Sequence, residues 1–441
     1  MKITFYGATQ EVTGSRYLLE YQDTKVLVDC GMFQGEKELS SRNYEPFPVD
    51  PKTIDAIVLT HAHIDHTGYL PALVKNGFKG TIYCSRATLA LCSILLADSG
   101  HIQEEEQKEH KQILYTTEDA EKTLKLFRPV EYDTNIVIEK LVIKLIRSGH
   151  ILGAAFVVVS NGDTTITFSG DLGRPNQIIM PAPPQLEKTD YLVLESTYGD
   201  RLHKDTDPIE KMGSIINQTL ARDGVVVIPA FAVDRTQEVL YCLYTLREQN
   251  KLPKVPIFLD SPMAIKVNGA YCAYKDEHKF PVELCNKVFA IANYTTTSQE
   301  SKKINGINKN AIVIAGSGMA NGGRVLHHLK HYLGNKKNTI LFVGYQAEGT
   351  LGRELIDGAE EVSIDDKTFN VRADIQSILS FSAHADYNEI LQWLSSFEHS
   401  PKKVFLTHGE LHAAQALQQK IKDTYGWPVV IPAYKESFEL I

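Results

Sequence analysis

The sequence has no long apolar segment and no closely paired cysteines. No run of eighteen or more apolar residues occurs among the 441 residues, so a transmembrane helix is not expected. Residues 1–7 are typical of a short strand rather than of a charged region followed by an apolar one, so we expect no signal peptide. No C-x-x-C pair is present, and the cysteines lie mostly in apolar segments. We therefore expect buried, reduced thiols in a cytoplasmic protein at Cys30, Cys84, Cys92, Cys242, Cys272 and Cys285.

Positive charge is also scarce. The chain has 46 lysines and arginines against 54 aspartates and glutamates, which gives a formal net charge of −8. This balance gives no indication of a nucleic-acid partner, because a polyanion would need a local positive site or bound metal ions. The chain contains 43% hydrophobic and 23% charged residues, which is ordinary for a folded protein and excludes a mainly disordered one.

The pattern of expected elements changes twice along the chain. The first 204 residues are rich in short strands, including 1–6, 15–21 and 25–29. From about residue 205 the expected strands alternate with helices, which predicts a parallel sheet. Short strands that end in histidine-bearing loops return after about residue 375. We therefore expect three segments, 1–204, 205–374 and 375–441.

The densest group of potential metal ligands follows an apolar strand expected at residues 56–59. His61, His63, Asp65 and His66 fall within six residues. In a strand, His61 and His63 would point to the same face. In a turn that enters a helix, Asp65 and His66 would point in another direction from that pair. One short segment could therefore supply two adjacent metal ions. Imidazole and carboxylate groups are suitable zinc ligands, and burying four such groups together without an ion is costly.

Later segments repeat one arrangement, in which an apolar strand leads to a loop of small residues that carries a potential ligand. Loops at strand ends commonly hold functional residues on a rigid scaffold. Taken together with the first cluster, this repetition favours a single site that includes His150, Asp171, Glu195, His384 and His408.

These motifs resemble the metallo-β-lactamase superfamily and, within it, the β-CASP branch of RNA-processing nucleases. The H-x-H-x-D-H pattern at residues 61–66 is typical of the superfamily. Glu195, the Ser-Ala-His motif at 382–384 and the Thr-His-Gly motif at 407–409 are typical of the branch. The Ser-Ala-His form is closer to the endonuclease subunit of cleavage and polyadenylation specificity factor than to RNase J. The resemblance implies an α/β fold, an αββα sandwich with an inserted β-CASP parallel-sheet domain, which agrees with the changes near 205 and 375.

The resemblance also implies a role for each site residue. Two Zn²⁺ per chain are implied, one held by His61, His63 and His150 and the other by Asp65, His66 and His408. Asp171 would bridge the two ions. Asp29 matches a carboxylate that orients the site, His384 the histidine proposed as general acid, and Glu195 its acidic partner. The ligand set suits zinc, although manganese or iron could occupy it in some preparations.

This ligand set supports phosphodiester hydrolysis. Two zinc ions can share a hydroxide, because zinc lowers the pKa of bound water to about 7, and Asp65 could orient that hydroxide. His384 is suited to protonate the departing sugar oxygen. The family resemblance implies a 5′-phosphate and a 3′-hydroxyl as products. We therefore expect a ribonuclease acting on single-stranded RNA, with endonuclease action preferred and 5′-exonuclease action possible.

The segment expected to be inserted carries residues that suit phosphate contacts. Arg324 and Arg353 end two glycine-containing stretches, each between a strand and a helix. Outside that segment, Ser382 stands beside the predicted acid and also suits a phosphate contact. Each arginine could contact RNA phosphates or form a structural ion pair. Three further histidines have helical spacing, and we expect a surface or interface role rather than metal binding for His327, His328 and His331.

Two other functions remain open from the sequence. A thioesterase or lactonase could use the same zinc core, although the inserted segment and the His384 motif count against it. A non-catalytic RNA-binding scaffold is disfavoured because no expected ligand is missing. A homodimer is compatible with the sequence, and no membrane partner is expected.

Overall fold

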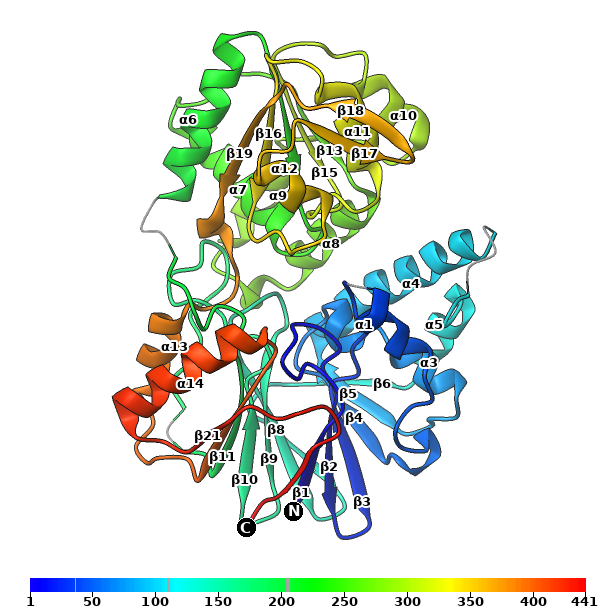
Figure 1. Cartoon of the computed structure of the whole chain (residues 1–441), viewed down its shortest axis with the longest axis vertical. Helices are drawn as coiled ribbons and strands as arrows, with labels where there is room; N and C mark the ends of the chain where they lie inside the picture. Colours follow the sequence, from blue (N-terminus) through cyan, green and yellow to red (C-terminus); the bar gives the residue numbers. More distant parts are fainter. Residues whose placement is uncertain (36, 109–111, 187, 204–206) are drawn as a thin grey trace. The chain divides into compact units, whose positions relative to one another are not determined.

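The computed structural model describes residues 1–35, 37–108, 112–186, 188–203 and 207–441 (Figure 1). The chain forms two compact units. The first unit contains Met1–Leu202 and Ala383–Ile441, and the second contains His203–Ser382. The domain boundary expected between residues 204 and 205 lies outside the described residues.

The first unit is built on two seven-stranded sheets. In strand order, one sheet contains β22 (Ser437–Glu439), β1 (Lys2–Phe5), β2 (Tyr17–Tyr21), β3 (Thr24–Val28), β4 (Ala56–Val58), β5 (Thr81–Ser85) and β6 (Phe127–Val130). The other contains β21 (Val429–Val430), β20 (Lys403–Thr407), β11 (Tyr191–Glu195), β10 (Thr165–Phe168), β9 (Ala155–Ser160), β8 (Leu141–Arg147) and β7 (Asn135–Ile138). The helices of this unit are α1 (Lys37–Ser41), α2 (Ile64–Thr67), α3 (Leu70–Lys75), α4 (Arg86–Lys108), α5 (Thr117–Leu124), α13 (Tyr387–Leu394) and α14 (Leu411–Tyr425).

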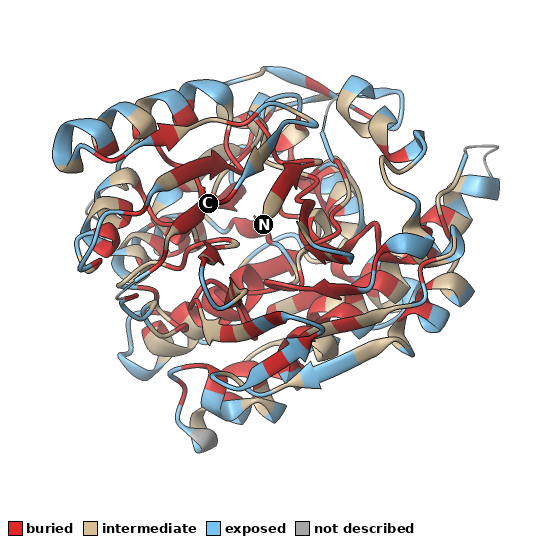
Figure 2. Cartoon of the chain, turned by 90° about the horizontal axis from the view of Figure 1, so that it is seen from below, coloured by how far each residue is buried: buried red, intermediate tan, exposed pale blue. Residues whose placement is uncertain are grey.

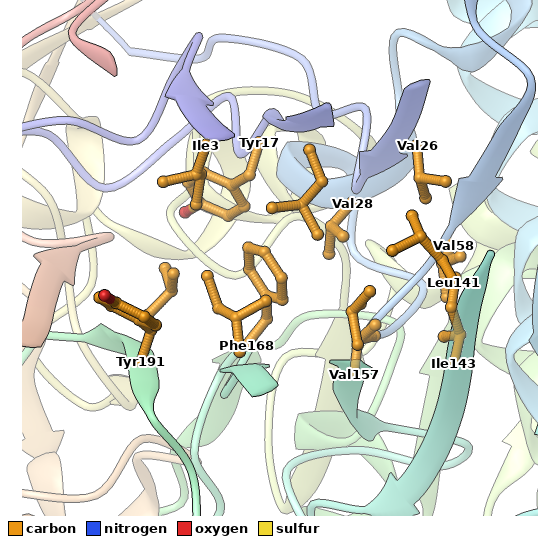
Figure 3. Close-up of a cluster of buried hydrophobic side chains, with 14 of the residues drawn as sticks. Ile3, Tyr17, Val26, Val28, Val58, Leu141, Ile143, Val157, Phe168 and Tyr191 are labelled. Atoms are coloured by element: carbon orange, nitrogen blue, oxygen red, sulfur yellow. The ribbon is translucent and has the colours of Figure 1, made fainter. Parts of the chain in front are cut away.

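A hydrophobic core lies between these two sheets. Figure 3 shows side chains from β1 to β4 pointing toward side chains from β8 to β11. Successive residues of a strand point to opposite faces, and β20 shows the result. Phe405 packs into the core between the sheets, whereas Val404 and Leu406 pack with Trp393 of α13 and Leu417 of α14. The predicted αββα sandwich is thereby confirmed.

The second unit contains a six-stranded sheet whose strands all pair in parallel within the described residues. Its strand order is β14 (Asn293–Tyr294), β13 (Ile257–Asp260), β15 (Ala311–Ala315), β12 (Val225–Pro229), β16 (Thr339–Val343) and β19 (Asp374–Ile378). Its other elements are α6 (Pro208–Ala221), α7 (Arg235–Glu248), α8 (Pro262–Ala273), α9 (Val282–Phe289), α10 (Ser298–Ile304), α11 (Arg324–Tyr332), α12 (Leu351–Ile356) and the hairpin β17 (Glu361–Ile364)–β18 (Lys367–Asn370).

The central strands of this sheet are apolar on both faces. All residues of β12, β15 and β16 are buried, as expected where helices cover both sides of a parallel sheet. Figure 2 colours the whole chain by burial and shows buried residues along strands and exposed residues on the outer helices. The parallel sheet predicted from the alternating pattern is therefore confirmed. β19 extends this sheet by pairing with β16, so Asp374–Ile378 lies in the second unit, whereas the sequence assigned residues from 375 onward to the other domain.

One expectation about the cysteines is wrong. Cys272 and Cys285 form a disulfide between α8 and α9, with a Cα–Cα distance of 5.8 Å. The two helices pack against each other, which brings together cysteines that are 13 residues apart and match no short motif. The other four cysteines are free and buried, as expected.

A strained turn precedes α7. Asp234 has φ 67° and ψ −60°, and the Arg235 N–H donates to the Val233 carbonyl at 2.8 Å, which closes a γ-turn of the rare hand. The Asp234 carboxylate is buried; one oxygen accepts from the Tyr271 hydroxyl at 3.2 Å, and the other has no hydrogen-bond partner among the residues that the structure describes. Burial and the nearby Glu238 raise the pKa of Asp234 to about 7.

We expect Asp234→Gly to stabilise the protein by about 1–3 kcal/mol, because glycine adopts this backbone conformation without the steric cost. A raised pKa means that the folded state binds the proton more tightly, so the parent protein loses stability as pH rises from about 4 through about 7. The gain on substitution should therefore be larger at pH 8 than at pH 5. Thermal melts of both proteins at the two pH values measure this gain. If Asp234→Gly is no more stable than the parent protein at pH 8, the strain argument is wrong.

Candidate metal centre

The histidine cluster lies where β4 gives way to α2. His61 and His63 are in the extended segment after β4, and α2 begins at Ile64, so Asp65 and His66 turn away on its first helical turn. The backbone of this segment packs closely against Ser15 and Gly31. The Asp65 carbonyl accepts from Ser15 N–H at 2.8 Å, and a Cβ at Gly31 would lie 1.5 Å from that carbonyl oxygen. Residue 31 must therefore be glycine for the segment to pack as it does.

The first group of potential ligands contains three imidazoles and one carboxylate. His63 Nδ1 lies 3.0 Å from His61 Nε2 and 3.4 Å from His150 Nε2. Asp171 Oδ2 lies 3.4 Å from His61 Nε2 and 3.2 Å from His150 Nε2. His150 follows β8 and Asp171 follows β10, so strands of the second sheet bring both to the segment after β4. Four atoms within 4.8 Å of one another can surround one ion.

The second group lies on the other side of Asp171. His408 follows β20, and its Nε2 lies 3.0 Å from Asp65 Oδ2 and 3.6 Å from Asp171 Oδ1. His66 Nε2 lies 3.2 Å from Asp171 Oδ1 and 3.8 Å from Asp65 Oδ2. The two oxygens of Asp171 therefore face different groups, Oδ2 the first and Oδ1 the second.

These donors fit metal ions. Asp171 is 1% exposed, and its Oδ1 has no hydrogen-bond partner among the described residues although burying an unpaired carboxylate oxygen is costly. Burial lowers the pKa of His61 to about 4, which favours the neutral form that binds a metal. Burial acts in the same direction on His66, but the charges of Asp171, Asp29 and Asp65 outweigh it and raise the pKa. Three carboxylates in one buried pocket would be stabilised by a cation.

Hydrogen bonds to Nδ1 turn the imidazole lone pairs of His61 and His66 toward the site. Thr60 donates its hydroxyl proton to Asp29 Oδ2 at 2.7 Å, so its oxygen accepts from His61 Nδ1 at 3.1 Å. His66 Nδ1 lies 2.7 Å from the same Asp29 oxygen. A protonated Nδ1 leaves the Nε2 lone pair to face the other ligands, as in many zinc sites. The structure thus places Asp29 behind the ligands, in contact with His66.

Thr197 holds His408 in the same way. Its hydroxyl donates to the His408 carbonyl at 2.9 Å, so its oxygen accepts from His408 Nδ1 at 3.1 Å. Sequence reasoning assigned no role to Thr60 or Thr197. Thr60 adjoins the histidine cluster and Thr197 adjoins the Glu195 loop, and both motifs were identified from the sequence. A threonine is not a typical metal ligand, so neither residue was recognised.

Glu195 and His384 form a pair beside Asp171. His384 Nδ1 lies 3.0 and 3.2 Å from the two Glu195 oxygens and 3.9 Å from Asp171 Oδ2. Glu195 is fully buried, whereas the His384 side chain is 22% exposed. Burial opposes protonation of His384, but the Glu195 charge and hydrogen bond outweigh it and raise the pKa to about 9. The imidazolium form is therefore populated at neutral pH.

The three residues assigned to RNA contacts lie in the second unit, and both arginines are ion-paired. Arg353 pairs with Asp357 one helical turn away, with its Nε 2.9 Å from the carboxylate. Arg324 Nη1 lies 2.6 Å from Asp260 Oδ1. Ser382 is buried, and its N–H donates to the Leu379 carbonyl at 3.3 Å. Their contact with RNA stays a prediction.

Comparison with known proteins identifies the family. Residues 10–215 match the metallo-beta-lactamase superfamily model and residues 236–355 the Beta-Casp domain. Residues 368–432 match the Zn-dependent metallo-hydrolase RNA specificity domain. The chain is 39% identical to ribonuclease TTHA0252 of Thermus thermophilus over 95% of both proteins. The chain belongs to the β-CASP branch of the metallo-β-lactamase superfamily. The resemblance inferred from the motifs is confirmed.

Two further relatives come from Methanocaldococcus jannaschii. The chain is 30% identical to transcription termination factor FttA of Methanocaldococcus jannaschii, over 93% of this chain and 67% of that protein. It is also 30% identical to an RNase J-like protein of the same organism, over 98% and 97% of the two chains. A crystal structure of a protein of unknown function from Enterococcus faecalis shares the fold, with a TM-score of 0.58 at 13% identity and 99% coverage of both chains.

The family and the ligand groups together support a divalent metal ion at this centre. The RNA specificity domain supports RNA as a partner. Within the described part of the chain, no helix is both long enough and apolar enough to cross a membrane.

Proposed function

We propose that the chain is a zinc-dependent ribonuclease that cleaves single-stranded RNA internally, with 5′-exonuclease action as a second capacity. The observation that carries this proposal is the position of the Glu195–His384 pair directly beside Asp171, the carboxylate that faces both ligand groups. A proton donor next to a two-ion site is what phosphodiester hydrolysis needs and what a purely structural metal site does not.

In this proposal each ligand group holds one zinc ion. His61, His63 and His150 hold the first, Asp65, His66 and His408 hold the second, and Asp171 contacts both. When bound, the zinc ions would activate water near neutral pH and offset the negative charge that develops on the phosphoryl oxygens.

The protein's own residues position the ligands and move the proton. Asp29, Thr60 and Thr197 fix the tautomers of His66, His61 and His408. Water loses one proton to the solvent and attacks phosphorus as hydroxide, the bond from phosphorus to the 3′ oxygen breaks, and His384 gives its Nε2 proton to that oxygen. Glu195 holds the opposite nitrogen throughout, which keeps the imidazolium populated. The products are a 5′-phosphate and a 3′-hydroxyl.

The thioesterase or lactonase alternative gains no support from these findings. The RNA specificity domain and the ribonuclease homologue favour RNA. The possible homodimer and the expected cytoplasmic location stay predictions.

One gel tests the function. Zinc-loaded protein is incubated with single-stranded RNA labelled at its 3′ end and capped at its 5′ end, beside Asp65→Ala. We expect discrete internal cuts that the variant does not make. If the capped RNA stays intact while a 5′-monophosphate RNA is trimmed, the enzyme is a 5′-exonuclease. If protein shown to hold metal cleaves neither RNA, the nuclease proposal fails.

A further inference from the structure

A basic groove lies within the second unit, apart from the metal ligands in sequence. It is lined by residues of α10 and α11, the two helices labelled in Figure 1, and has a volume of about 390 Å³. Four lining residues come from one face of α10 and its C-cap, and four come from one face of α11. None is acidic, and they are Ser298, Ser301, Lys302, Asn305, Arg324, His327, Lys330 and His331.

The surrounding segment is strongly basic in an acidic protein. Residues 298–337 contain seven lysines and arginines but one acidic residue, Glu300, whereas the whole chain has a net charge of −8. The Glu300 carboxylate accepts from the backbone N–H groups of Thr296 and Thr297 at 2.8 and 3.0 Å. The only acid of the segment is therefore engaged in capping α10 rather than in pairing with a lysine.

A buried carboxylate fixes the wall of the groove. Asp260 is fully buried and accepts from Arg324 at 2.6 Å, from His328 at 2.7 Å and from Ser301 at 2.6 Å. Arg324 also donates to the carbonyls of Thr295 and Thr296, so its guanidinium is held in place. His328 is thus a buried structural residue, which corrects the expected surface role. A preorganised arginine loses little conformational entropy when an anion binds.

The other cations differ in how far they are neutralised. Lys330 forms an ion pair with Asp365. Lys302 is exposed and forms no ion pair with any residue that the structure describes. His327 and the hydroxyl of Ser298 are further hydrogen-bond donors in the groove lining, whereas the Ser301 hydroxyl is already used by Asp260.

We propose that this groove binds backbone phosphates of the RNA substrate, as a second contact beyond the metal centre. The proposal rests on the proposed ribonuclease function. Ammonium, guanidinium and hydroxyl groups are the donors that phosphate oxygens prefer. Among the described residues, the groove lining contains no tyrosine, phenylalanine or tryptophan, and its charged and hydroxyl donors suit the phosphate backbone.

The test compares two neighbouring lysines of α10. Lys302→Glu changes the groove, whereas Lys303→Glu makes the same charge change at an exposed position of the same helix that does not line it. Affinity of the full-length protein for labelled single-stranded RNA is measured at several salt concentrations. We expect Lys302→Glu to weaken binding roughly three- to tenfold and to reduce the salt slope by about 0.7, as for one lost phosphate contact. His327→Glu should act in the same direction.

The outcomes separate the groove from the catalytic proposal. Equal losses for Lys302→Glu and Lys303→Glu would overturn the groove, because a general surface field would then explain both. A selective loss for Lys302→Glu supports the groove even if no RNA is cleaved. For an active enzyme we expect a raised KM and an unchanged kcat, and a fall in kcat alone would count against a binding role. Thermal melts identify a variant that fails to fold, in which case His327→Glu carries the comparison.

Discussion

Asp171→Asn should abolish RNA cleavage, with a loss of roughly a thousandfold or more, and should lower the metal content of the protein. Asparagine has nearly the same shape but only one carbonyl oxygen. Its amide nitrogen must face either the first ligand group or the second, where the parent residue presents Oδ2 or Oδ1. An N–H group directed at a cation binds no metal, so at least one ion should be lost. Metal analysis of the purified variant, together with the cleavage gel, measures both effects.

Asp29→Asn is the matched control, since it is an equally buried aspartate behind the ligands. It contacts His66 rather than facing both groups, so we expect a smaller loss of metal affinity, about 10- to 100-fold. Full metal content and full activity in Asp171→Asn would contradict the assignment of this residue as the shared ligand. Far-ultraviolet circular dichroism of both variants confirms that the sheets are intact.

The sequence predicts most of this centre because its signals are local. His61, His63, Asp65 and His66 stand together, and the change from strand to helix at Ile64 separates them into two pairs. His150, Asp171 and His408 each follow a strand of the second sheet, and Glu195 is the last residue of another. Neighbouring strands end close together, so a repeated pattern of strand and loop is enough to bring distant residues into one site.

The features that sequence reasoning missed depend on partners far along the chain. Asp260 is an ordinary strand-end aspartate until α11 places Arg324 and His328 beside it. Asp234 occupies a backbone conformation that normally suits glycine, and the residues next to it in the sequence do not predict this conformation. The Cys272–Cys285 pair requires two helices to pack, and β19 joins the second unit only through its pairing with β16. The local pattern of apolar and polar residues does not predict such long-range contacts.

His384→Ala should lower kcat by roughly 10²- to 10⁴-fold while leaving the metal content unchanged. His384 touches Glu195 and lies 3.9 Å from the nearer oxygen of Asp171, so its removal deletes the proton donor without deleting an assigned ligand. Glu195→Gln should cause a smaller loss, because it keeps the imidazole but removes the charge that stabilises its protonated form. Single-turnover cleavage rates and metal analysis of each variant provide the comparison.

An RNA whose scissile 3′ oxygen is replaced by sulfur tests the role directly. A thiolate is a much better leaving group than an alkoxide and departs without a proton, as thiol pKa values near 8.5 indicate. If His384 supplies the leaving-group proton, the sulfur substrate should restore most of the cleavage by His384→Ala, but not by Asp171→Asn, which lacks the activated water. Equal defects of both variants on both substrates would instead assign His384 to binding or to support of the metal centre. The pattern of rescue therefore separates proton transfer from metal binding at two residues that lie almost in contact.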